Sequence, residues 1–146
     1  MNNPRPDKLD DLIGYNMRRA SAWMLSDFGD MFADTALRPT SFSVACVIDE
    51  QPGITSAEIC RILGLQRANI VTLLAELETV DAIRRVDDAE DRRIQRLYLS
   101  DSGKADLSRW RDMAARHEDR VLKRLSQQER ADLLHMLRRI WRDSEE

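Results

Sequence analysis

The sequence has few of the residues that build metal sites, disulfide frameworks and active sites. It contains two cysteines, Cys46 and Cys60, which lie far apart, and two histidines, with no CxxC pair and no histidine at ligand spacing. This usage indicates neither a zinc site nor a disulfide framework, predicts no cofactor, and is typical of the reducing cytoplasm. The sequence also has no GxSxG motif and no glycine-rich phosphate loop, so we predict a protein that is not an enzyme.

A long apolar segment and an excess of positive charge are also absent. No run of about 18 apolar residues suggests a membrane span, and the opening MNNPRPDKLDD has no apolar core of a signal peptide. The net charge is -3, whereas non-specific nucleic-acid binders need clustered Lys and Arg to neutralise phosphates. We therefore expect no membrane partner, and any DNA-binding role must depend on local clusters of arginine.

What the 146-residue chain does contain is typical of one helix-rich globular domain. Hydrophobic residues make up 42% and charged residues 34%, with five glycines and four prolines. Apolar residues recur three or four positions apart near the start, which predicts a long amphipathic helix over residues 8–36. Two further helices are expected within residues 101–143, the first with Asp101 or Ser102 as its cap. SQQE, a capping box, would begin the second.

The middle of the chain, residues 37–100, has the pattern of a helix-turn-helix followed by a hairpin. A capping box from Thr55 to Glu58 predicts the start of a short helix, and Gly64 predicts its end. QRANIVTLLAELETV follows at once with one apolar stripe and predicts a second helix. AIRRV and RRIQRLYLS flank the acidic turn DDAED, as in an antiparallel hairpin. We therefore predict a mainly α fold with a small β-hairpin wing, a winged helix-turn-helix.

The start of the second of these helices carries candidate base-reading residues. In a winged helix this first turn enters the major groove, where arginine suits guanine, asparagine or glutamine suits adenine, and threonine suits a thymine methyl or a phosphate. The candidates are Gln66, Arg67, Asn69 and Thr72. The same residues would also suit the solvated face of an ordinary helix. The hairpin that follows is what favours the DNA-reading interpretation.

Arginines surround the tip of the predicted wing. Arg93 is the first candidate for insertion into the narrow, electronegative minor groove. Asp91 is expected to bond to Arg93 or to a loop amide and so fix its direction. The other wing arginines would contact phosphates or pair with nearby acids. They are Arg84, Arg85, Arg92 and Arg96.

These features resemble the multiple antibiotic resistance regulator (MarR) family of bacterial transcription factors. The resemblance covers residues 37–104 and includes a DxR-type wing, Asp91-Arg92-Arg93, and an LTxxG-like exit, LSDSG at 99–103. Two positions depart from the family pattern, because Val71-Thr72 stands where a Thr-Arg pair is frequent and Asp81 stands where a glycine is frequent.

The resemblance implies a single MarR-like domain over residues 1–146 that forms a homodimer. Helices within 8–36 and 101–143 would make the dimer interface, holding two winged lobes, each 37–100, over a pseudo-palindromic operator in double-stranded DNA. It also implies that a small ligand binds between the dimer region and the DNA-binding lobe and releases the DNA, as expected of a repressor.

A group of aromatic and cationic residues indicates what such a ligand would be. An aromatic-lined cavity with a cation at its mouth suits an aromatic carboxylate or its coenzyme A thioester. LIGYNMRRA is also similar to the LGYxLRRA opening of MarR relatives that answer to hydroxycinnamoyl-coenzyme A in aromatic catabolism. The candidate ligand-binding residues are Tyr15, Arg18, Arg19, Trp23, Phe28, Phe42 and His117.

Three other interpretations stay open at this point. Trp23 and Phe28 would equally suit a dimer core, with the arginines in solvent. A winged helix without DNA binding would hold a protein partner through its last two helices, and its arginines would be scattered or neutralised by acids. Cys46 or Cys60 would make the regulator redox-sensing, although related peroxide sensors place their cysteine near the start of the first helix, where this chain has none.

Overall fold

The structure is a computed structural model that describes residues 8–35 and 37–142. Within these ranges the chain forms a short 3-10 helix, six α-helices and one two-stranded antiparallel sheet, which confirms the predicted mainly α fold with a β-hairpin wing. None of the described helices is long and apolar enough to cross a membrane. The elements are η1 (Leu9–Asp11), α1 (Ile13–Met31), α2 (Pro39–Glu50), α3 (Ser56–Leu63), α4 (Arg67–Thr79), β1 (Ile83–Asp87), β2 (Gln95–Leu99), α5 (Asp101–Val121) and α6 (Gln127–Arg142).

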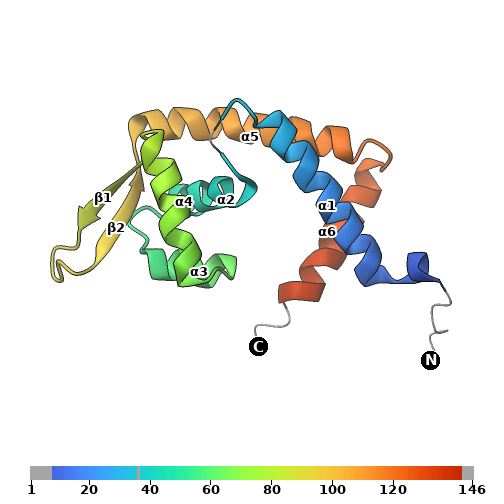
Figure 1. Ribbon diagram of the computed structural model, residues 1–146, viewed down its shortest axis with the longest axis horizontal. Helices are drawn as coiled ribbons and strands as arrows, with labels where there is room; N and C mark the ends of the chain where they lie inside the picture. The colour runs from blue at the N-terminus through green and yellow to red at the C-terminus, as the bar shows by residue number, and fades with distance from the viewer. Residues whose placement is uncertain (1–7, 36, 143–146) are drawn as a thin grey trace.

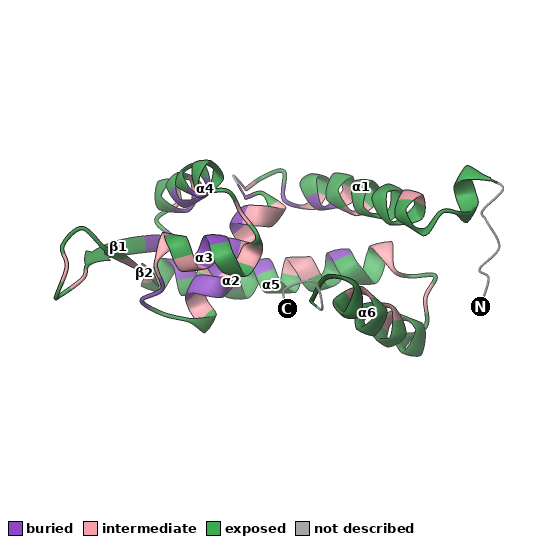
Figure 2. Ribbon diagram, turned by 90° about the horizontal axis from the view of Figure 1, so that it is seen from below, coloured by how far each residue is buried: buried purple, intermediate pink, exposed green. Residues whose placement is uncertain are grey.

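The long helix α5 joins two regions of the molecule (Figure 1). Helices α2, α3 and α4 gather with the β1–β2 hairpin at one end of α5, and we call this group the winged lobe. Helices α1 and α6 extend from the other end. The burial pattern differs between the two regions, because buried residues concentrate in the winged lobe whereas α1 and α6 are largely exposed (Figure 2).

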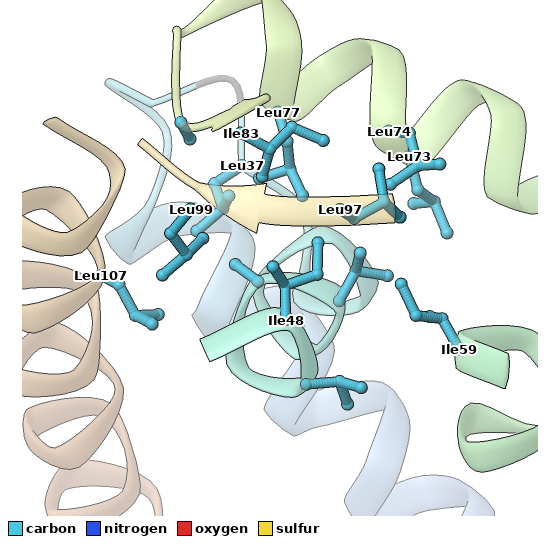
Figure 3. Packing of buried hydrophobic residues seen from close by; sticks show 14 of the residues in the cluster. Leu37, Ile48, Ile59, Leu73, Leu74, Leu77, Ile83, Leu97, Leu99 and Leu107 are labelled. Carbon is cyan, nitrogen blue, oxygen red and sulfur yellow. The ribbon is translucent and has the colours of Figure 1, made fainter. Parts of the chain in front are cut away.

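The hydrophobic core lies inside the winged lobe. Ile48 of α2, Ile59 of α3 and Leu77 of α4 have no exposed surface. Strand β2 passes between α2 and α4 and contributes Leu97 and Leu99 to this core (Figure 3). Since side chains alternate between the two faces of a strand, Tyr98, which lies between them, points away from the core. The base of the wing is therefore packed on the same core as α4.

Local signals in the sequence placed α3 and α4 correctly. The Thr55 amide donates to the Glu58 carboxylate at 2.9 Å, and the Glu58 amide donates to the Thr55 hydroxyl at 3.4 Å, which confirms the capping box. Gly64 adopts the left-handed conformation, with φ 63°, and ends α3 as predicted. Because only two residues separate this glycine from Arg67, α4 begins directly after the turn.

The single helix predicted over residues 8–36 is wrong at both ends. Leu12 is extended, with φ -80° and ψ 118°, and separates η1 from α1. The Asn16 side-chain amide donates to the carbonyls of Asp10 at 2.6 Å and Leu12 at 2.9 Å, which stabilises this break. At the other end the helix stops at Met31, and the Phe32 ring is buried against Phe28 with a centroid separation of 4.1 Å. Residues 36 and 143, which end the two predicted dimerisation segments, lie outside the described residues.

The predicted cap of α5, Asp101 or Ser102, is also wrong. Ser100 is the cap, and its hydroxyl accepts from the Gly103 amide at 2.8 Å. The hydroxyls of Ser100 and Ser102 both donate to the carbonyl of Asp81, at 2.5 and 2.9 Å. Asp81 has φ 54° and so adopts the left-handed conformation for which glycine is usual. These bonds fix the start of α5 to the turn between α4 and β1.

Candidate nucleic-acid interface

Helix α4 is held by one face and presents the other to solvent. Ile70, Leu73 and Leu74 are buried in the core, whereas the four base-reading candidates at the start of the helix are exposed. Within the described part of the chain, the side chains of these four make no hydrogen bond or ion pair. The four are Gln66, which is the cap residue, Arg67, Asn69 and Thr72. Their hydrogen-bonding groups are therefore available to another molecule.

The start of α2 lies beside this exposed face. Asn69 and Thr72 line a hollow of about 280 Å³ together with Arg38 and Thr40. Arg38 and Thr40 are not predicted from the sequence, because no local pattern indicates that the start of α2 packs against α4. Val71, where the family pattern has threonine, is 65% exposed on the same helix and offers an apolar contact of the kind that a thymine methyl takes.

Two of the wing arginines are bound within the protein. Arg85 donates to the Glu78 carboxylate of α4 through Nε at 2.5 Å and through Nη2 at 3.2 Å. Arg96 donates to Asp88 at 2.5 Å and to the carbonyl of Gly53 at 3.0 Å. Pairing with acids, one of the two predicted roles, is thus confirmed for both, although Glu78 was not foreseen. The bonds to Glu78 and to the Gly53 carbonyl fasten the wing to the rest of the lobe.

Other wing arginines remain directed to solvent. Arg84 is exposed, with its guanidinium 5.1 Å from the centroid of the Tyr98 ring. Arg92 is exposed and has no hydrogen-bond or ion-pair partner in residues 8–35 and 37–142. Both are therefore available for phosphate contacts, as the sequence predicts.

The tip of the wing has the predicted link between Asp91 and Arg93. Asp91 Oδ1 accepts from the backbone amide and from Nε of Arg93, both at 3.0 Å, and Oδ2 accepts from Nη2 at 2.9 Å. The Arg93 side chain nevertheless stays 90% exposed. The bonds from Arg93 also lower the pKa of the Asp91 carboxyl. The guanidinium is thus oriented in advance while its other donors face solvent.

Asp88 holds the turn from which Asp91 and Arg93 project. Its Oδ1 accepts from the amides of Glu90 at 2.9 Å and Asp91 at 3.1 Å, and its Oδ2 accepts from Arg96. The Glu90 amide, followed by Arg96 and the Asp91 amide, lowers the pKa of Asp88 from 3.8 to about 2. The charged carboxylate is therefore the form that the folded wing favours.

Replacing Asp88 with asparagine is expected to remove part of the acid sensitivity of folding. Because the pKa of Asp88 is lower in the folded chain than in the unfolded chain, its stabilisation is complete above about pH 4 and is lost as the pH falls toward 2. Urea unfolding midpoints at pH 7, 4, 3 and 2 measure this for wild type and Asp88→Asn. Asp87→Asn, which changes an exposed neighbour, is the matched control. Parallel pH profiles for wild type and Asp88→Asn would contradict this role.

A cavity of about 540 Å³ lies between α1, α2, α5 and α6. Three of the predicted ligand-binding residues line it, namely Phe28, Phe42 and His117. Its walls are mainly apolar and include side chains from α6 that the sequence analysis missed. The other lining residues are Met17, Ala20, Ser21, Met24, Leu25, Pro39, Ser43, Ala114, Glu118, Leu122, Leu133 and Leu137.

The other predicted ligand-binding residues lie outside this lining. The guanidinium groups of Arg18 and Arg19 lie 5.4 and 5.9 Å from the centroid of the Tyr15 ring, and Arg19 donates to the Tyr15 hydroxyl at 3.4 Å. Trp23 is 55% exposed. Within one protomer, therefore, the predicted aromatic wall is partly assembled, but the predicted arginines do not form the mouth of the cavity.

An unforeseen charged pair supports His117 at the edge of this cavity. His117 Nδ1 lies 2.7 Å from Oδ2 of Asp27, and Arg120 donates to Oδ1 of the same carboxylate at 2.8 Å. Arg120 is the largest influence that lowers the pKa of the Asp27 carboxyl, and His117 acts in the same direction. The sequence indicated His117 but not its partner, because Asp27 is 90 residues away.

Comparison with known proteins shows which family has this arrangement. Residues 37–94 match the model of the MarR family. The chain is also 36% identical to the transcriptional repressor CouR in its structure bound to a 23-mer DNA duplex, over 95% of this chain and 99% of that one, with a TM-score of 0.86. The protein belongs to the MarR family. As a MarR-family regulator it is a transcription factor and not an enzyme.

Two further comparisons describe relatives of this MarR-family regulator. CouR bound to p-coumaroyl-CoA is 35% identical, over 94% of this chain and 97% of that one, with a TM-score of 0.81. A Thauera aromatica protein named for transcriptional regulation of the hcr operon is 26% identical over 135 residues, which cover 92% of this chain and 81% of that protein.

The cysteines of this MarR-family regulator do not have the setting of reactive thiols. Burial raises the pKa of the Cys46 thiol, and the neighbouring Arg111 offsets this only in part. Cys60 is 8% exposed. Since the thiolate is the reactive form, a raised pKa disfavours oxidation at Cys46. The described residues also contain no group of three or more residues able to hold a metal ion.

Proposed function

We propose that this regulator is a cytoplasmic repressor that binds double-stranded operator DNA as a homodimer and is released by an aromatic acid or its coenzyme A thioester. One observation carries the proposal: the base-reading candidates of α4 are exposed and unpaired, and the wing of the same lobe carries an oriented Arg93, in a chain similar to CouR bound to DNA. The effector class is supported by CouR bound to p-coumaroyl-CoA and by the apolar cavity of this chain.

The predicted DNA-contacting residues of α4 and the wing take different roles in this proposal. Arg67 would read guanine, Gln66 and Asn69 would read adenine, and Thr72 would meet a thymine methyl or a phosphate. Arg93 would enter the minor groove. Arg84 and Arg92 would contact phosphates. Arg85 would hold the wing in position through Glu78, and Arg96 through the Gly53 carbonyl, which makes their contribution to binding indirect.

The helices outside the winged lobe supply the surface for the homodimer. No residue of α6 is buried, and its apolar side chains Leu134 and Ile140 are 48% and 57% exposed. Ile13 of α1 is 73% exposed. Exposed apolar surface of this extent marks a protein interface. Pairing these helices across a two-fold axis would place two α4 helices at half-sites about 34 Å apart, which matches one turn of DNA.

Helix α2 connects the cavity to the DNA-reading helix. Its residue Phe42 lines the cavity, whereas the adjacent Ser41 has no exposed surface and donates to the Glu76 carboxylate of α4 at 2.5 Å. Arg38, at the start of α2, forms an ion pair with the same carboxylate. Although burial raises the pKa of Glu76, the bonds from Arg38 and Ser41 outweigh this and lower it. An effector that displaces α2 would therefore also displace α4.

Replacing Arg93 with alanine is expected to weaken binding to all DNA sequences alike. The guanidinium reads groove width and charge rather than a base, so its loss should reduce the slope of log affinity against log salt by about one. A gel-shift titration at several salt concentrations, on the DNA upstream of the protein's own gene, measures this. Arg116→Ala, which removes an exposed arginine from α5, is the matched control. An unchanged slope for Arg93→Ala would remove the wing from the proposed interface.

A further inference from the structure

His117 is the one cavity-lining residue whose polar side chain is buried and already bonded on one side. It is 5% exposed, and its ring stands edge-on to Phe28 with centroids 5.5 Å apart. Nδ1 is occupied by Asp27 at 2.7 Å, and Asp27 is itself fixed by Arg120 at 2.8 Å. The orientation of the imidazole is therefore determined by α1 and α5 before any ligand arrives.

The second ring nitrogen of His117 is available to the cavity. Nε2 has no hydrogen-bond partner in the described part of the chain. Among those residues, Trp110 Nε1 is the only side-chain nitrogen or oxygen that is fully buried without a partner, so Nε2 must reach accessible space. His117 lines the cavity, so the cavity is accessible space beside this side chain.

The bond to Asp27 decides whether Nε2 donates or accepts a hydrogen bond. In a neutral imidazole one nitrogen donates and the other accepts, and a carboxylate at Nδ1 requires Nδ1 to be the donor. Nε2 is then an acceptor and needs a donor from the ligand. A hydroxyl group supplies one, whereas ethers, carboxylates and thioester carbonyls only accept. A hydroxyl would also satisfy a protonated ring, because its oxygen accepts.

We propose that His117 Nε2 binds the ring hydroxyl of a phenolic effector and so selects aromatic acyl groups with this hydroxyl over those in which it is absent or methylated. The inference rests on the proposed function, since it specifies the effector of the same cavity. Phe28 and Phe42 enclose the ring beside His117. The acyl chain, and with it the coenzyme A moiety, then points away from His117.

The experiment compares the affinities of three thioesters by isothermal titration calorimetry. They are p-coumaroyl-CoA, cinnamoyl-CoA, which lacks the hydroxyl, and 4-methoxycinnamoyl-CoA, in which it is blocked. Wild type should bind p-coumaroyl-CoA about tenfold more tightly than the other two, as expected for one hydrogen bond at a buried site. In His117→Leu the ratio should fall to about one.

Two further variants keep the test decisive. Asp27→Asn leaves the imidazole in place but removes the carboxylate that fixes its tautomer, so it should also reduce the ratio even if His117→Leu fails to fold. Ser43→Ala removes a different polar group from the cavity wall and should retain the ratio. The inference is overturned by equal affinities in wild type, or by a preference that survives both changes at His117 and Asp27 or disappears in Ser43→Ala. Failure of all three thioesters to bind would instead contradict the proposed effector class, and this inference with it.

Discussion

The Gly103→Ala variant is expected to lose about 3 kcal/mol of its free energy of unfolding, at the upper end of the effects of overpacking. A β-carbon at this position would lie 1.9 Å from the carbonyl oxygen of Ala82 and 2.7 Å from its carbonyl carbon. Both are backbone atoms, and neither can move freely. The Ala82 carbonyl accepts from the Ser100 amide at 2.9 Å, and the Ala82 amide donates to the Leu77 carbonyl at 2.8 Å.

Equilibrium unfolding in urea measures this effect, and the chain contains a matched control. Gly29 lies exposed in α1, and a β-carbon there would have no atom within 4 Å. Gly29→Ala should therefore gain up to about 1 kcal/mol from helix propensity. If Gly103→Ala unfolds at the same urea concentration as wild type, the close approach of α5 to the base of the wing is not a constraint on the fold.

Arg67→Ala is expected to weaken operator binding by about 1–3 kcal/mol and to relax selection at one base pair. The Arg67 side chain is exposed at the first residue of α4 and has no partner within the described ranges. The next turn of the same helix is anchored by Ile70 and Leu74, which are 4% and 2% exposed. The guanidinium is therefore carried by a fixed helix and is free to make a bidentate contact with guanine.

Affinities for a set of operators, each with one base pair changed, distinguish this contact from a phosphate contact. Wild type should discriminate at the position that Arg67 reads, and Arg67→Ala should bind all variants at that position with similar affinity. The Arg116→Ala control should retain the wild-type pattern. Uniform weakening across the whole set would show that Arg67 binds phosphate, and no weakening would place it outside the interface.

Features that depend on a few neighbouring residues could be predicted from the sequence. The Thr55–Glu58 capping box and the bond between Asp91 and Arg93 join residues at most three positions apart, and the left-handed conformation of Gly64 concerns a single residue. The two strands were also recognisable, because Leu97 and Leu99 alternate with residues that face away from the core. Order of elements and local motifs together were sufficient for the winged fold.

Contacts between distant segments were not predictable in the same way. Asp27 with His117, Ser41 with Glu76 and the α6 wall of the cavity depend on how helices cross, which periodicity does not encode. Periodicity also failed to reveal the break at Leu12, since the apolar spacing continues through it. For the same reason the predicted arginines of α1 were assigned to a cavity whose lining, within one protomer, does not include them.

The acidic net charge raised the alternative of a winged helix without DNA binding. Three wing arginines are indeed paired with acids, Arg85 with Glu78, Arg93 with Asp91 and Arg96 with Asp88. The pair of Arg85, however, fastens the wing to α4, and the Arg93 side chain stays 90% exposed. Arg67 and Arg92 are left without acidic partners in the described chain. The local distribution of charge therefore favours DNA binding in spite of the net charge of -3.

The most direct measurement is a gel shift of the purified protein on the DNA upstream of its own gene, with and without p-coumaroyl-CoA and free p-coumaric acid. We expect a salt-sensitive complex that one of these compounds dissociates. Feruloyl-CoA, which retains the ring hydroxyl, is included to widen the effector class. A complex that none of the compounds affects would contradict the proposed effector, and the absence of any complex on this DNA or on neighbouring promoters would contradict the repressor assignment itself.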